Sequence, residues 1–126
     1  MSLKNANIHL SDEALEMIAA RFRCLGEPIR LKILRALEDG EANVGHLVDL
    51  LHATQANVSK HLKVLVDAGI LARRPQGTAA FYSIADPVAL TLCRTVCDDL
   101  AEKLKAQAGV FGLTVSEGQI APGSRG

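Results

Sequence analysis

The segment of residues 54–69, TQANVSKHLKVLVDAG, constrains the fold most, because its apolar side chains recur with the period of an α-helix. The spacing i, i+4, i+7, i+8 places four of them on one side, and these are Val58, Leu62, Leu65 and Val66. Thr54 is a residue type that commonly caps a helix N-terminus. The opposite side is polar and nearly free of acids. We therefore expect a helix that buries one side in the core and presents the other to a partner.

Three more helices are predicted ahead of this segment. Ser11 is a good N-cap, and the two acids after it favour a first helix that ends at Gly26. Pro28 suits the first turn of a second helix, which is expected to continue until Gly40. A third, short helix fits residues 43–51, whose apolar residues also repeat with a helical period.

The pattern changes after Gly69. The runs ILARR and AAFYSI flank PQGT, which indicates a two-stranded hairpin with Pro75 in its loop. Asp86 and Pro87 then predict the start of a last helix that continues to about Gly109. The expected fold is mainly α with a small β-hairpin, in the order α-α-α-α-β-β-α, which is the order of a winged helix-turn-helix.

The length of 126 residues indicates one domain. We expect an N-terminal arm at residues 1–10, the winged helix-turn-helix at 11–110, and a disordered tail at 111–126, where periodicity is absent and Gly and Ser are frequent. No apolar run approaches the roughly 20 residues of a membrane span, and no signal pattern is present. A cytoplasmic protein with no membrane partner is therefore expected, and an odd count of three cysteines predicts reduced thiols.

Basic residues gather between positions 54 and 77, although the chain as a whole is formally neutral. This segment contains four basic residues and a single acidic one. The excess of positive charge indicates that this segment binds an anionic partner. Gln and Asn pair with adenine edges, Ser and Thr contact bases or phosphate, and Lys and Arg attract the DNA backbone. The residues expected to contact double-stranded DNA are Thr54, Gln55, Asn57, Ser59, Lys60, His61, Lys63, Arg73, Arg74 and Gln76. The alternative is a polar side that is merely solvated.

Two stretches, LGEPIRLKIL and VSKHLKVLVDAGIL, together with FYSI, resemble the ArsR-type (ArsR/SmtB) winged-helix repressors of bacteria. The resemblance covers about residues 14–108. It implies a homodimer whose first and last helices pair across a twofold axis, with each recognition helix in a groove of a palindromic operator. It also implies that a ligand or oxidation releases the DNA, and that the protein is not an enzyme. Family wings often carry a basic residue after the tip glycine, whereas Gly77 is followed here by Thr78.

The three cysteines are the candidate sensor. Cys93 and Cys97 are four residues apart and so share one face of the last helix. Cys24 lies opposite the main apolar stripe of the first helix. Because the resemblance implies that the first and last helices pair in a dimer, we expect Cys24 to approach Cys93 or Cys97 of the same or the other chain. Three convergent thiolates would bind trivalent arsenic, and two would form a redox disulfide. The alternative is that these cysteines only pack as small apolar side chains. No other cofactor is expected.

The standard metal ligands of the family are missing. The third helix has His46 and Val48 where arsenic and cadmium sensors have a Cys-x-Cys pair, and the last helix has no histidine. A standard zinc site is therefore not expected. A constitutive repressor without a sensor and a winged-helix module that docks a protein stay open as alternatives. An enzyme is disfavoured, because no His accompanies the paired cysteines and no Gly-rich phosphate loop is present.

Overall fold

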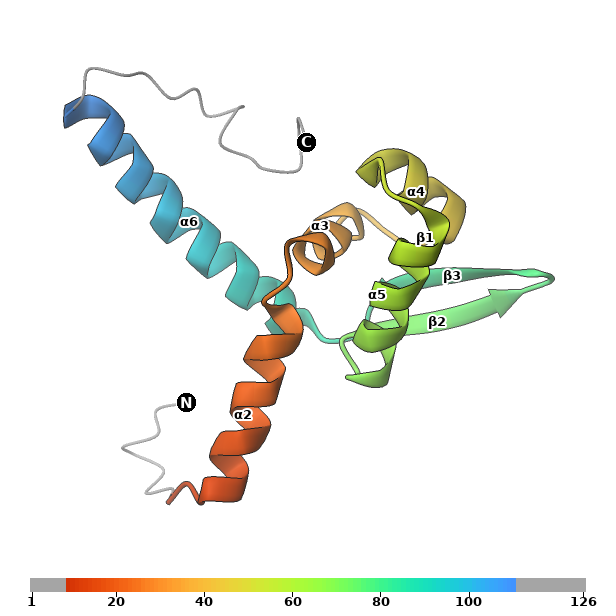
Figure 1. Cartoon of the computed structure of the whole chain (residues 1–126), viewed down its shortest axis with the longest axis horizontal. Coiled ribbons are helices and arrows are strands. Elements are labelled where there is room, and N and C mark those ends of the chain that lie inside the picture. Colours follow the sequence, from red (N-terminus) through yellow and green to blue (C-terminus); the bar gives the residue numbers. More distant parts are fainter. Residues whose placement is uncertain (1–8, 111–126) are drawn as a thin grey trace.

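The computed structural model describes residues 9–110, which fold mainly into helices, with a small sheet at one end of the molecule (Figure 1). In chain order the elements are α2 (Asp12–Leu25), α3 (Pro28–Ala36), β1 (Ala42–Asn43), α4 (Val44–Leu51), α5 (Gln55–Asp67), β2 (Leu71–Gln76), β3 (Ala79–Ile84) and α6 (Pro87–Val110). The predicted mainly helical fold with a β-hairpin is confirmed. The strand β1 was not predicted, and the tail expected at 111–126 lies outside the described residues.

Local capping sets the helix starts. Ser11 Oγ accepts a hydrogen bond from the backbone N–H of Ala14 at 3.1 Å, and Thr54 Oγ1 accepts one from the N–H of Asn57 at 3.1 Å. Asn43 Oδ1 caps α4 in the same way, through the N–H of His46 at 2.8 Å. Each cap satisfies a backbone donor that has no partner inside its own helix.

Helix α3 is shorter than predicted, because it ends at Ala36 instead of continuing to Gly40. Leu37 forms the C-cap, and its buried side chain belongs to the core. Gly40 adopts a φ of +142°, a region that glycine enters at little cost. The chain thereby leaves the helix in a turn and enters β1.

The sheet is antiparallel in the order β1-β3-β2, so β2 is an edge strand. The expectation that Pro75 lies in the hairpin loop is wrong, because Pro75 pairs with Ala80 inside the ladder. An edge strand accepts proline, since one side of its backbone needs no ladder partner. The turn consists of Gly77 and Thr78 alone, and Gly77 has the positive φ of +62° that such a tight hairpin requires.

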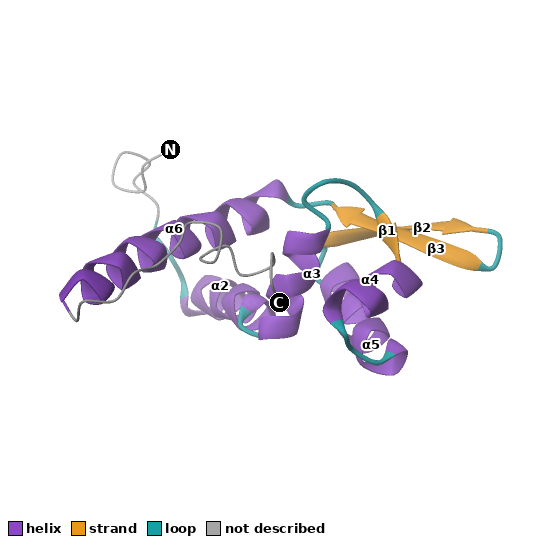
Figure 2. Cartoon of the chain, turned by 90° about the horizontal axis from the view of Figure 1, so that it is seen from above, coloured by secondary structure: helices purple, strands orange, loops and turns teal. Residues whose placement is uncertain are grey.

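The core lies between helices α3, α4 and α5 and the sheet. Three of the four predicted apolar positions of α5 are fully buried, and Val66 is only partly buried. The fully buried side chains of the core include Ile33, Leu34, Leu47, Val58, Leu62, Leu65 and Ile70. Figure 2 shows these helices and the sheet at one end, with α2 and α6 at the other. Within residues 9–110, no helix is both long and apolar enough to cross a bilayer.

Candidate nucleic-acid interface

Helix α5 separates its two sides as the sequence predicts. Val58, Leu62 and Leu65 are fully buried, which fixes the rotation of the helix on the core. The polar residues of its first half are exposed, and they are Thr54, Gln55, Asn57, Ser59 and Lys60. The first turn holds no acid, so the positive end of the helix dipole is not neutralised there. This surface combines donors, acceptors and a positive field.

Two lysines of α5 add charge to the surface. Lys60 is exposed and has no ion-pair partner within residues 9–110. Lys63 Nζ lies 3.1 Å from Asp67 Oδ2, with 77% and 62% of the two side chains exposed. Exposed i, i+4 ion pairs are weak and are screened by salt. Lys63 can therefore leave Asp67 and bind another anion, such as a phosphate.

His61 is not part of the exposed surface, and the prediction that it contacts DNA is wrong. Its side chain is only 6% exposed, and its Nδ1 accepts a hydrogen bond from Nε of Arg30 at 3.0 Å. Burial is the main cause that lowers its pKa, and the nearby cations Arg30 and Lys60 act in the same direction. His61 therefore faces the protein as a neutral acceptor.

Two arginines connect α5 to α2, and neither contact can be predicted from the spacing of residues along the chain. Arg21 Nη1 donates to the carbonyl of Ala68 at the end of α5 at 2.8 Å, and the same guanidinium lies 3.8 Å from Asp86. Arg30 Nη1 donates to the carbonyl of Cys24 at 3.0 Å. Helix α5 is thus held at its middle and at its C-terminal end.

The adjacent arginines of the hairpin have different surroundings. Arg73 is exposed and has no hydrogen-bond or ion-pair partner within the described part of the chain. Arg74 donates to both carboxylate oxygens of Glu41, from Nη2 at 2.6 Å and from Nε at 3.2 Å. Its Nη1 donates to Gln76 Oε1 at 2.9 Å, and its guanidinium lies 5.0 Å from the centre of the Phe81 ring. Arg74 and Gln76 are therefore engaged with the protein itself.

The outer helices expose apolar side chains that no other element within residues 9–110 covers. On α2 these include Leu15, Ile18 and Phe22, the stripe that the sequence singles out, and Phe22 is 57% exposed. On α6 they are Val88, Val96, Leu100 and Leu104. Cys24, on the other side of α2, packs against the core cluster. The apolar stripe of α2 is thus largely exposed, and so is Met17 on the side of Cys24, at 74%.

A cleft of about 490 Å³ lies between α3 and α6, and Cys93 and Cys97 both line it. Burial raises the pKa of the Cys93 thiol, and the positive charge of Arg35 partly opposes this. Among residues 9–110, no three His, Cys, Asp or Glu side chains are placed to share a metal ion. The expected convergence of Cys24 with the other two cysteines is therefore wrong within one chain, and convergence between chains stays a prediction.

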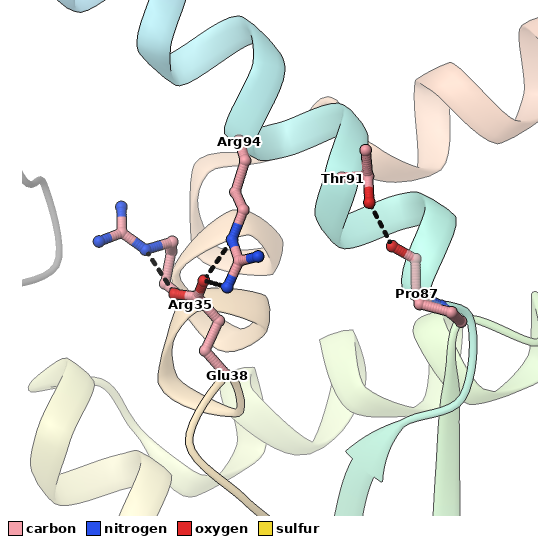
Figure 3. A network of polar contacts seen from close by, with 5 residues as sticks. All are labelled: Arg35, Glu38, Pro87, Thr91 and Arg94. Atoms are coloured by element: carbon pink, nitrogen blue, oxygen red, sulfur yellow. Dashed lines mark hydrogen bonds and ion pairs between the residues drawn. The ribbon is translucent and has the colours of Figure 1, made fainter.

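An ion network joins α3 to α6 beside this cleft (Figure 3). Glu38 accepts from Nε of Arg35 at 3.2 Å and from Nε of Arg94 at 2.7 Å. The carboxylate is shielded by the two arginines, with 19% of the Glu38 side chain exposed. On the next turn towards the start of α6, the Thr91 hydroxyl donates to the carbonyl of Pro87 at 3.1 Å. The carboxylate of Glu38 thus links α3 to α6 through the two arginines.

A family model described as "Bacterial regulatory protein, arsR family" matches residues 27–73. The HTH-type transcriptional regulator MJ1325 of Methanocaldococcus jannaschii, itself uncharacterized, is 41% identical over 75 residues, which cover 59% of this chain and 84% of that protein. The arsenical resistance operon repressor of Bacillus subtilis is 32% identical over 75 residues, which cover 59% of this chain and 71% of that protein. The transcriptional repressor SmtB of Mycobacterium tuberculosis is 36% identical over 74 residues, and the chain spans 55% of its length.

Two solved structures are similar over most of the described residues. The crystal structure of Rv0081 from M. tuberculosis has a TM-score of 0.69 at 32% identity, covering 78% of this chain and 99% of that chain. The homodimeric winged helix-turn-helix DNA-binding domain of Mb0332 from Mycobacterium bovis, a possible ArsR-family regulator, has a TM-score of 0.68 at 27% identity, covering 76% and 92%. The fold is therefore a winged helix-turn-helix, in which α4 and α5 form the helix pair and β2 and β3 form the wing.

Proposed function

The chain belongs to the ArsR family of bacterial regulatory proteins, and we propose that it is a homodimeric repressor that reads a palindromic operator through residues 54–68 and the wing at 70–84. The family and the matched relatives are DNA-binding regulators of transcription and not enzymes. We assign both DNA binding and dimerisation to residues 11–110. Operator binding would place the protein in the cytoplasm, where bacterial DNA lies.

We name α5 the recognition helix. The main support for the proposal is that the first half of this helix is exposed and contains no acidic residue. Gln55 and Asn57 have the amide groups that pair with adenine edges, while Ser59 and Lys60 suit bases or phosphate. The buried side of the same helix is already occupied by the core. A polar and positive helix face beside an exposed wing fits the major groove and its flanking phosphates.

The homodimer is supported by the uncovered apolar side chains of α2 and α6. Side chains as large as Phe22 and Leu100 are more than half exposed, and a second copy would remove them from water. The similar Mb0332 domain is described as homodimeric. A twofold axis would place two recognition helices on successive turns of one DNA face, which is why a palindromic operator is proposed.

Fluorescence anisotropy tests the DNA-binding proposal, with labelled duplexes tiled across the promoter of the chain's own operon. We expect one duplex to bind at nanomolar concentration, with log Kd rising linearly with log salt as phosphate contacts are lost. Charge reversal at Lys60 or Arg73 should abolish this binding. Two results would favour the alternative of a protein-docking module. In one, no duplex binds; in the other, binding does not depend on salt concentration and persists in both charge-reversal variants.

The proposed effector is trivalent arsenic or an oxidant that reacts with Cys93 and Cys97. Both thiols line the cleft between α3 and α6, where a change in bonding would act on the angle of α6. Burial raises the pKa of the Cys93 thiol and keeps it protonated at neutral pH, so capture of a thiophilic ion there would release its proton. The Bacillus subtilis relative is an arsenical resistance repressor. Cys24 would join only from the partner subunit. The alternative is a constitutive repressor in which these thiols only pack.

A further inference from the structure

The hairpin has two faces with different roles, and its register identifies them. Successive residues of a strand point to opposite faces, so Arg73 and Arg74 cannot face the same way. Arg73 pairs with Tyr82 in the ladder, and Tyr82 is buried on the face that packs on the core with α5. Arg74 pairs with Phe81 on the outer face. Arg73 therefore shares its face with the recognition helix, and Arg74 lies behind it.

Arg74 crosses the sheet on that outer face. Strand β3 lies between β2 and β1, and the guanidinium of Arg74 passes over the Phe81 ring of β3 to reach Glu41, the residue before β1. The contact with Glu41 uses two parallel hydrogen bonds, a geometry that fixes direction as well as distance. One side chain thus connects all three strands.

This connection lies where the wing most needs support. Strand β1 pairs only with Phe81 and Tyr82, so the hairpin beyond these residues has two strands and projects from the body (Figure 1). Two-stranded ribbons have little stability of their own, and their direction depends on what holds their base. The contacts of Arg74 with Phe81 and Glu41 are made at this base.

We propose that Arg74 is a positioning residue that fixes the direction of the wing through Glu41, and that Arg73 is the wing residue that meets the DNA backbone. This inference rests on the proposed DNA-binding function. It assigns opposite roles to two neighbouring arginines that composition alone cannot distinguish. It also gives Glu41, an acid near a DNA-binding surface, a role that supports binding.

The salt dependence of operator affinity separates the two roles. Arg73→Gln removes a phosphate contact, so the slope of log K against log salt should fall in magnitude by about 0.9 for each wing on the duplex. Arg74→Gln and Glu41→Gln should each weaken binding about two- to fivefold, as expected for an exposed ion pair, with the slope unchanged. The double variant should bind as each single variant does, because both remove the same contact.

A second measurement needs no DNA. Amide hydrogen exchange of residues 76–81 should accelerate in Arg74→Gln and in Glu41→Gln, because the base of the wing loosens, and should stay at the parent rate in Arg73→Gln. Three results would overturn the inference: a reduced salt slope in Arg74→Gln, tighter DNA binding in Glu41→Gln, or unchanged exchange in both. If the parent protein itself binds no duplex in a salt-dependent way, the proposed function fails instead, and the exchange measurement still tests the role of Arg74.

Discussion

Arg30 holds the recognition helix from inside the protein, because its Nε donates to Nδ1 of His61 at 3.0 Å. The same guanidinium donates from Nη1 to the carbonyl of Cys24 at 3.0 Å. Arg30 thus joins α3, the middle of α5 and the C-terminal end of α2. Since Nδ1 of His61 accepts this bond, the imidazole must be neutral with its proton on Nε2.

The first prediction is that the free energy of unfolding falls in mildly acidic solution. The pKa of His61 is held below its ordinary value of 6.5, mainly by burial and also by Arg30 and Lys60. The unfolded chain therefore takes up this proton before the folded protein does. The stability is fully present above pH 6.5 and decreases as pH falls from there towards the lowered pKa.

Urea unfolding at pH 7.5, 6.5 and 5.5 measures this effect. His61→Gln keeps a neutral polar side chain and should flatten the dependence over this range. The exposed His46 provides the matched control, since His46→Gln should retain the parent profile. A His61→Gln profile as steep as that of the parent would place the responsible proton elsewhere.

The second prediction concerns the two hydrogen bonds of Arg30. Arg30→Met keeps an apolar stem but leaves Nδ1 of His61 and the carbonyl of Cys24 without their donor. Each is part-buried, so we expect a loss of about 1–3 kcal/mol in the free energy of unfolding. Arg23→Met removes an exposed arginine of α2 and serves as the control. It should change the free energy of unfolding by less than about 0.5 kcal/mol. Equal losses in the two variants would contradict the assignment.

The sequence predicted those parts of the fold that depend on neighbours along the chain. Ser11 and Thr54 start helices as expected, since a cap bonds to a residue three positions on. For His61 and Arg74, the sequence predicts DNA contacts from residue type alone. Their partners lie 31 and 33 positions away, at Arg30 and Glu41, so only the folded chain brings them together.

The third prediction is that Lys60 of the recognition helix contacts phosphate, whereas Asn57 contacts bases. Lys60→Ala should weaken binding to every duplex alike and reduce the salt slope by about one for each bound helix. Asn57→Ala should weaken operator binding by about 1–3 kcal/mol while leaving nonspecific binding unchanged. Lys103 lies on α6, which runs away from α5 (Figure 1), so Lys103→Ala serves as the control. Loss of discrimination in Lys60→Ala but not in Asn57→Ala would reverse these roles.

The fourth prediction is that single acidic substitutions on the outer helices produce monomers. Phe22→Asp removes a large apolar side chain that enters a twofold interface twice, so the dimer Kd should rise at least about 100-fold. Leu50 on α4 is also about half exposed, at 49%, and Leu50→Asp should leave the dimer intact. Sedimentation velocity measures both, with circular dichroism to verify folding. A dimeric Phe22→Asp protein would move the interface away from α2.

The fifth prediction is that operator release by arsenite depends on the thiols of the α3–α6 cleft. Cys93 and Cys97 share one face of α6 and line the cleft, whereas Cys24 on α2 is not among the residues that line it. The double variant Cys93→Ser, Cys97→Ser should stay on the operator at arsenite concentrations that release the parent protein. Cys24→Ser should respond like the parent if the pair alone binds the ion, and should lose the response if the site spans two subunits. The same anisotropy titration, repeated with peroxide, persulfide, zinc and cadmium, identifies which chemical class of effector releases the operator. Release of the double variant by the same agent at the same concentration would show that these cysteines only pack.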